Sequence, residues 1–154
     1  NLALAIRHAP QNFSAGKKSM QNCIFCKIVR GEIPSNKVYE DDKTIAFLDI
    51  NPISKGHALV IPKNHCSDIF DMGEEDAKAV IATAKKVANA AMQGLDADGM
   101  NLLNANRKAA GQEVFHYHMH VIPRYENDKM RLFPIDRYKE GDFKGTAEKI
   151  KDMI

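Results

Sequence analysis

Residues 115–124, FHYHMHVIPR, constrain the fold more than any other part of this sequence of 154 residues. His116, His118 and His120 occupy alternate positions there. Successive side chains of a β-strand point to opposite faces of the sheet, so an extended backbone places all three imidazoles on one face and the intervening residues on the other. The pattern predicts a strand at 114–123 with a histidine-rich face.

A single histidine on a strand is typical of a hydrogen-bonded core residue. Three neighbouring imidazoles are harder to explain by packing, because each brings a donor and an acceptor that need partners. Two kinds of chemistry use such a face: a metal ion held by imidazoles, or a nucleophilic imidazole oriented by its neighbours. The residues alone predict a functional site and leave both kinds open.

The composition favours one domain that acts on a small molecule. A chain of this length buries enough surface to fold without the help of disulfides or a bound metal. The net charge of +2 gives no support for a nucleic-acid or membrane surface, and no run approaches the roughly 18 apolar residues of a membrane span. The cysteines are odd in number, and Cys23 and Cys26 form a C-x-x-C pair. This usage favours a reducing, cytoplasmic location.

Residues 1–19 are interpreted as a leader or an expression-derived extension outside the fold. They lack the apolar core of a signal peptide, and their basic residues permit a weaker interpretation as a transit peptide. We therefore expect one domain at 20–154, with a tail from about residue 125.

The pattern of apolar and turn residues predicts an α+β domain with a five-stranded antiparallel sheet, one long helix and a short N-terminal helix. Asp71 and Glu74 are expected to form a capping box at the start of the long helix, which should end at Gly94. The expected elements are a helix at 23–30, strands at 37–41, 44–50 and 56–62, the long helix at 71–94, strands at 100–105 and 114–123, and a short helix from 146.

Three segments resemble the histidine-triad (HIT) nucleotide-binding proteins, and in particular the zinc-containing bacterial members of their Hint-like branch. They are CIFCKIVRGEIPSNKVYEDD, AFLDINPISKGHALVIPKNH and AGQEVFHYHMHVIPR, the last containing the histidine triad followed by Val121 and Ile122. The resemblance covers about 23–124. It implies the HIT fold, a homodimer formed through the long helix and a strand edge, and a purine nucleotidyl hydrolase or transferase acting at the α-phosphate of nucleoside phosphoramidates or related nucleotides.

The resemblance also implies roles for four histidines. His118 would attack phosphorus and form a nucleotidyl-histidine, His120 would donate to the phosphate oxygens, and His57 would support the triad. His116 would stand beside the nucleophile. A neutral imidazole attacks through its free nitrogen if its other nitrogen keeps a proton, which we expect a neighbouring backbone carbonyl to hold. Glutamine replaces the third histidine in the transferase branch, so histidine at 120 favours hydrolysis.

The same resemblance points to the substrate-binding residues. Asp49 would accept hydrogen bonds from the ribose hydroxyls. The purine would occupy a slot formed by Ile24, Phe25, Ile28, Phe47 and Ile50, although ordinary core packing explains these residues equally well.

Gln112 and the backbone at Gly111 are expected to cradle the phosphate. Asn104 or Asn106 would add a contact, unless they only form turns. Glu113 departs from the family pattern, because many relatives carry a small hydroxyl residue there, and an ionised carboxylate cannot donate a hydrogen bond.

A structural zinc site is the remaining expectation, and the resemblance assigns it to Cys23, Cys26, His65 and His116. Two thiolates and two imidazoles complete a tetrahedron and leave no position for water. Cys66 is the rival ligand, or else a small buried residue.

Two alternatives to a covalent hydrolase remain open. One is a hydrolase in which zinc on the triad activates water. The other is a zinc-stabilised nucleotide-binding adaptor with little turnover.

Overall fold

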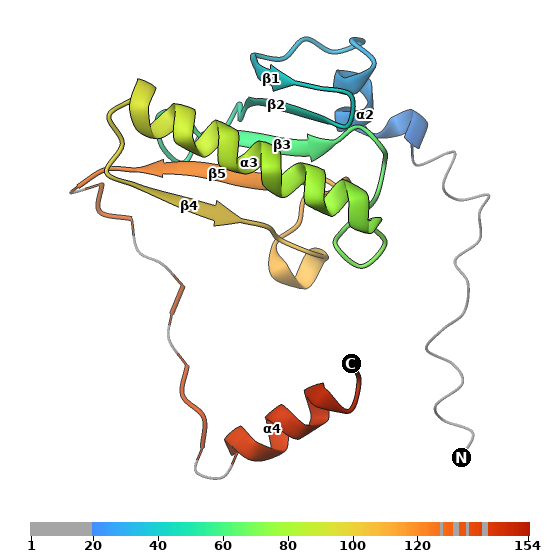
Figure 1. Cartoon of the computed structure of the whole chain (residues 1–154), viewed down its shortest axis with the longest axis vertical. Coiled ribbons are helices and arrows are strands. Elements are labelled where there is room, and N and C mark those ends of the chain that lie inside the picture. Colours follow the sequence, from blue (N-terminus) through green and yellow to red (C-terminus); the bar gives the residue numbers. More distant parts are fainter. Residues whose placement is uncertain (1–19, 127, 131–132, 135, 140–141) are drawn as a thin grey trace.

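The computed structural model describes residues 20–126, 128–130, 133–134, 136–139 and 142–154. Its centre is a five-stranded antiparallel sheet with the strand order β1-β2-β3-β5-β4, crossed by one long helix (Figure 1). The α+β prediction is confirmed. The elements are α2 (Ile24–Val29), β1 (Lys37–Glu40), β2 (Thr44–Leu48), β3 (Ala58–Pro62), α3 (Glu74–Gly94), β4 (Gly99–Leu103), the 3-10 turn η1 (Lys108–Ala110), β5 (Met119–Arg124) and α4 (Asp142–Lys151).

The two helices at the sheet cover opposite faces, which explains why the central strands are buried on both sides. From α3, Val80 and Ala84 pack against Val60 and Val121 of the sheet. On the other face, α2 packs Phe25 and its neighbours against side chains of β2 and β3. Apolar residues at three- and four-residue steps give each helix the stripe that this packing needs. The predicted leader at 1–19 lies outside the described residues.

The predicted capping box at the start of α3 is wrong. The helix begins at Glu74 with Gly73 at the N-cap, and no side chain caps it. The Asp71 carboxylate instead accepts hydrogen bonds from the backbone N–H groups of Ser67 and Asp68, both at 3.0 Å. Aspartate side chains often bond nearby backbone donors, and here the preceding turn offers them.

The fifth strand starts later than predicted, at Met119. The residues before it form a bend, and the Tyr117 N–H donates to the carbonyl of Cys66 at 2.7 Å. The alternation of faces nevertheless holds. Tyr117 lies in the cluster under α3, whereas His116 and His118 contact Phe25 of α2 on the other face.

The final helix also begins earlier than predicted, at Asp142 rather than Thr146. In Figure 1 it stands apart from the sheet. Within the described residues, no helix combines the length and the apolar content that crossing a bilayer requires.

Gly56, just before β3, provides a stability test. Its φ is +87°, and a Cβ added there would lie 2.2 Å from Cδ1 of Leu95 at the end of α3. Left-handed backbone and overpacking together should make Gly56→Ala less stable by about 2–4 kcal/mol in urea unfolding.

Gly94→Ala is the matched control, because a Cβ on this helical residue meets nothing within 4 Å. It should leave stability unchanged or raise it by up to about 1 kcal/mol. Equal effects of the two substitutions would contradict the packing described for Gly56.

Candidate active site

A cavity of about 360 Å³ opens between α2, β2 and the histidine-bearing segment. Its apolar wall contains all five residues that are predicted to form the purine slot, and three of them also belong to the core. Asp49, His118 and His120 line the same cavity. The residues of the slot are Ile24, Phe25, Ile28, Phe47 and Ile50.

His118 is only 6% exposed, and its proton position follows from one contact. Nδ1 lies 2.8 Å from the carbonyl oxygen of His116. A carbonyl only accepts, so Nδ1 carries the proton and Nε2 keeps its lone pair. Burial lowers the pKa of His118, although the hydrogen bond to His116 opposes this shift. The imidazole is therefore neutral near neutral pH, with Nε2 available as a nucleophile.

A chain of hydrogen bonds also fixes the tautomer of His120. The Ile53 N–H donates to Nδ1 of His57 at 3.1 Å, so the proton of neutral His57 is on Nε2. This Nε2 lies 2.9 Å from Nδ1 of His120 and donates to it. Burial lowers the pKa of His57 and lowers that of His120 to about 4. His120 is thus neutral, with its own proton on Nε2 as a donor.

Asp49 follows β2, and its side chain is 16% exposed. One oxygen accepts the Asn51 N–H at 2.8 Å, and the other lies 3.7 Å from Nε2 of His57. Asp49, His57 and His120 come close enough to suggest a metal site. However, both nitrogens of His57 are already used in the hydrogen-bond chain, which accounts for the proximity without an ion.

Gln112 does not line the cavity; it braces the loop that does. Its side chain is buried, its Oε1 accepts the Arg107 N–H at 2.6 Å, and its Nε2 donates to the carbonyls of Ser67 at 2.6 Å and Val114 at 3.1 Å. All of these bonds are to backbone groups. Gln112 therefore holds the loop that places Gly111 and Glu113 at the cavity.

Asn104 likewise acts on the backbone of the triad. Its Nδ2 donates to the carbonyl of His118 at 2.8 Å, and its Oδ1 accepts from Asn106. The Asn106 Oδ1 in turn accepts the Ile69 N–H at 2.8 Å. The two asparagines thus connect the backbone of His118 to the turn before α3.

Ser35 is a cavity residue that the sequence did not reveal. Its hydroxyl is buried and has no hydrogen-bond partner among the described residues. It lies in an irregular connection between α2 and β1, where neither periodicity nor a motif marks a binding residue.

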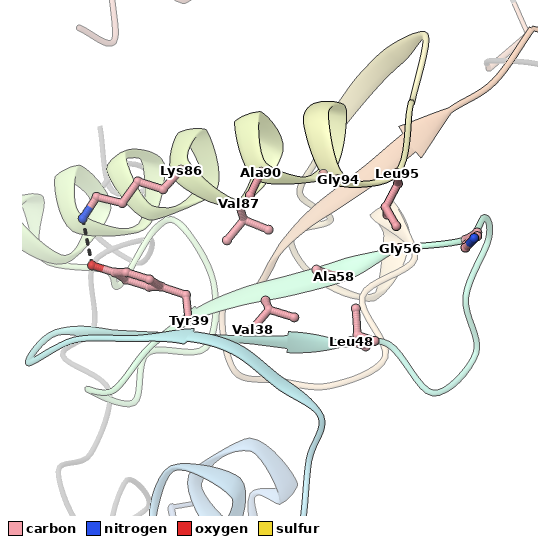
Figure 2. Close-up of a pocket in the computed structure, with 12 residues that line it drawn as sticks. Val38, Tyr39, Leu48, Gly56, Ala58, Lys86, Val87, Ala90, Gly94 and Leu95 are labelled. Carbon is pink, nitrogen blue, oxygen red and sulfur yellow. Dashed lines mark hydrogen bonds between the residues drawn. The ribbon is translucent and has the colours of Figure 1, made fainter.

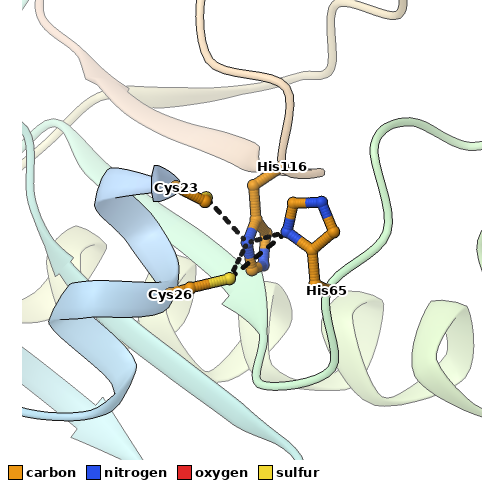
Figure 3. Close-up of side chains that lie close together, drawn as sticks. All are labelled: Cys23, Cys26, His65 and His116. Carbon is orange, nitrogen blue, oxygen red and sulfur yellow. Dashed lines mark hydrogen bonds between the residues drawn. The ribbon is translucent and has the colours of Figure 1, made fainter. Parts of the chain in front are cut away.

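Two thiols and two imidazoles lie close together at the first histidine of the triad (Figure 3). Cys23 and Cys26 come from the start of α2, and His65 comes from the loop after β3. Nδ1 of His116 lies 3.5 Å from each sulfur and 3.2 Å from Nδ1 of His65, which is itself 3.3 Å from Sγ of Cys26. Cys66 lies outside this group, in the core under α3.

These separations fit one tetrahedral zinc ion. With Zn–N near 2.0–2.1 Å and Zn–S near 2.3 Å, the edges of the tetrahedron are about 3.3–3.8 Å. Nε2 of His116 donates to the carbonyl of Pro62 at 2.9 Å, which turns the lone pair of Nδ1 toward the cluster. Burial lowers the pKa of His116 to about 4, so the ring is neutral, as a ligand must be.

A second, larger cavity of about 470 Å³ lies between α3 and the β1–β2 hairpin (Figure 2). Its wall is mostly apolar, and Lys86 donates to the Tyr39 hydroxyl at 2.8 Å at one end. Within the part of the chain that the structure describes, no histidine, cysteine or carboxylate lines it. The groups capable of chemistry belong to the smaller cavity.

Comparison with known proteins identifies the family. The model of the HIT domain matches residues 30–127. A relative called Protein hit, from Bacillus subtilis, is 52% identical over 105 residues, which are 68% of this chain and 72% of the relative. The chain belongs to the HIT family.

Two further HIT relatives bear on the site. The structure of a Zn-bound histidine triad family protein from Mycobacterium smegmatis has a TM-score of 0.70 and 37% identity, covering 88% of this chain and 99% of that one. Adenylylsulfatase HINT3 from Arabidopsis thaliana is 44% identical over 111 residues, which are 71% of this chain and 56% of the relative. The family thus includes a protein named as an adenylylsulfatase and a zinc-bound member.

The tautomer of His118 is directly measurable. Long-range ¹H–¹⁵N correlation spectra near neutral pH should show the proton on Nδ1 and an unprotonated Nε2, because the His116 carbonyl accepts from Nδ1. His118→Ala assigns the signal by removing it. A proton on Nε2 instead of Nδ1 would contradict the hydrogen bond and leave Nε2 without a lone pair for attack.

Proposed function

We propose that this HIT protein hydrolyses purine nucleoside phosphoramidates, or related nucleotides, through a nucleotidyl-histidine formed on His118. The observation that carries the proposal is the bond from Nδ1 of His118 to the His116 carbonyl. It leaves Nε2 as a neutral nucleophile on a residue that lines the cavity. The similarity to a relative called an adenylylsulfatase supports reaction at an adenylyl group.

The reaction takes two displacements at the α-phosphorus. Nε2 of His118 donates its lone pair to phosphorus, and the bond to the leaving group breaks; an amine leaves with that electron pair and takes a proton from solvent. Water then attacks phosphorus, the N–P bond breaks, and one proton is released. The products are a nucleoside monophosphate, the free leaving group and neutral His118.

The surrounding groups would stabilise and position the substrate. Nε2–H of His120 donates to the phosphate oxygens as charge develops, and His57 keeps it in the donor tautomer. Asp49 accepts from the ribose hydroxyls, and the purine packs in the apolar slot. Asn104 acts as a positioning residue, through the carbonyl of His118.

The loop held by Gln112 is proposed to form the wall of the cavity next to the phosphate site. Gly111 and Glu113 line the cavity from this loop. Gln112 itself is proposed to contribute through its backbone bonds rather than by contact with phosphate.

We propose zinc as the resident metal, held by Cys23, Cys26, His65 and His116. The donor separations and the Zn-bound relative support this assignment. Such an ion would be structural, because four protein ligands leave no site for water. It would join the start of α2, the loop after β3 and the segment that leads to His118.

A homodimer and a cytoplasmic location complete the proposal. Strand β4 lies at the edge of the sheet, and Leu102 of β4 and Ile81 and Met92 of α3 are exposed apolar side chains that a second copy could cover. Free Cys23 and Cys26, required as thiolates, suit a reducing compartment.

A covalent intermediate is the first test. The protein is incubated with adenosine phosphoramidate, quenched in base, where phosphohistidine bonds persist, and analysed by mass spectrometry. Wild type should carry an adenylyl group and release AMP; His118→Ala should carry none and turn over at least about 10³-fold more slowly.

The binding of AMP to His118→Ala, measured by calorimetry, is the control for folding. AMP release without an adduct, abolished by chelation, would replace the proposal with a zinc-activated water mechanism. Binding without turnover by wild type would favour an adaptor.

Metal content tests the zinc assignment. Purified wild type should hold about one zinc ion per chain, since the donor set completes one tetrahedron, whereas Cys26→Ser should lose most of it and melt at a lower temperature. Cys66→Ala is the matched control, because Cys66 packs in the core under α3. It should keep its zinc. Equal zinc content in all three proteins would contradict the assignment.

A further inference from the structure

We propose that Glu113 makes this active site select substrates whose leaving group carries a positive charge, and reject those whose leaving group is anionic. This rests on the proposed function, since it names the substrate class that the same cavity prefers. The inference comes from the distribution of charge around the cavity.

The cavity is unusual for a phosphate site because it offers no fixed cation. Its charged lining residues are Asp49 and Glu113, and no lysine or arginine lines it in the described part of the chain. Nδ1 of His120 accepts a hydrogen bond from His57, so this ring is neutral, and His118 donates from Nδ1 to the His116 carbonyl, which leaves its Nε2 as a nucleophile. A substrate therefore meets two carboxylates and no compensating positive charge beyond what it brings itself.

The two carboxylates differ in their surroundings. Asp49 accepts a backbone hydrogen bond and lies beside His57, within the part of the cavity assigned to the ribose. Glu113 is exposed and has no ion-pair partner within 4.0 Å among the described residues. Arg107, on the same loop, instead pairs with Asp68 at 3.5 Å and stacks on Phe70. The charge of Glu113 remains free to act on a bound molecule.

The backbone around Glu113 is held on both sides. Gln112 makes three side-chain hydrogen bonds to backbone groups, and Val114 packs against the cluster of α2, β2 and β3. The backbone of Glu113 is therefore held at the wall of the cavity, and its side chain reaches solvent from there.

The other walls of the cavity are assigned to the purine, the ribose and the phosphate, and this assignment determines which part of a substrate lies beside Glu113. With the purine in the apolar slot, the ribose at Asp49 and phosphorus at His118, the wall of Gly111 and Glu113 remains for the leaving group. A positive charge on that group is attracted by Glu113, and a negative charge is repelled. Because the side chain is exposed, the effect should be modest, about 3- to 10-fold in kcat/KM, and weaker at high salt.

Three adenosine phosphoramidates with the same short alkyl spacer test the proposal. The far end of the leaving amine carries an ammonium, a neutral acetamide or a carboxylate. Hydrolysis to AMP is followed for each with wild type, Glu113→Gln and Glu74→Gln. Glu74 is the matched control, an exposed glutamate at the start of α3 that does not line the cavity.

Wild type should prefer the cationic substrate. In Glu113→Gln, the ratio of kcat/KM for the cationic to the neutral substrate should fall about 3- to 10-fold, and the ratio for the anionic to the neutral substrate should rise by a similar factor. Both changes should shrink at about 1 M salt, and Glu74→Gln should show neither. A structural role for Glu113 would not move the two ratios in opposite directions.

Two outcomes would overturn the inference. One is an equal change in kcat/KM for all three substrates in Glu113→Gln; the other is no change in either ratio. Failure of the proposed function is distinguishable, because wild type would then release no AMP from any of the three.

Discussion

The site depends on the hydrogen bond from Nδ1 of His118 to the carbonyl of His116. At 2.8 Å it fixes both the orientation and the tautomer of His118 within one short segment. Without it, burial would still keep the ring neutral, but nothing would decide which nitrogen faces the substrate. The arrangement uses a backbone acceptor, which cannot change its protonation state.

His116 connects this bond to the rest of the fold. Its carbonyl holds His118, its Nε2 donates to Pro62 at the end of β3, and its Nδ1 faces the two cysteines of α2 and His65. Through these contacts His116 connects α2, the end of β3 and the triad. A metal ion bound there would stiffen the backbone that positions His118.

Much of the fold and of the residue content of the site could be predicted from the sequence. The apolar periodicity was sufficient for the sheet and α3, and alternation within the triad correctly separated the histidine face from the face of Tyr117. The cap at Asp71 failed because a local turn offered that carboxylate nearer donors. Gln112 and Asn104 were assigned to phosphate, but their side chains bond the backbone, and no local pattern distinguishes these two uses of an amide.

The sequence by itself determined the chemical inventory: three alternating imidazoles, a C-x-x-C pair, and an acid at the end of an apolar strand. The tertiary structure decided which nitrogen of each ring carries its proton, and that Glu113, a carboxylate with no ion-pair partner among the described residues, lines the same cavity as His118. The reason is physical. A residue's type and its periodic face follow from local geometry, whereas a tautomer or an unbalanced charge depends on partners that the chain supplies from distant positions.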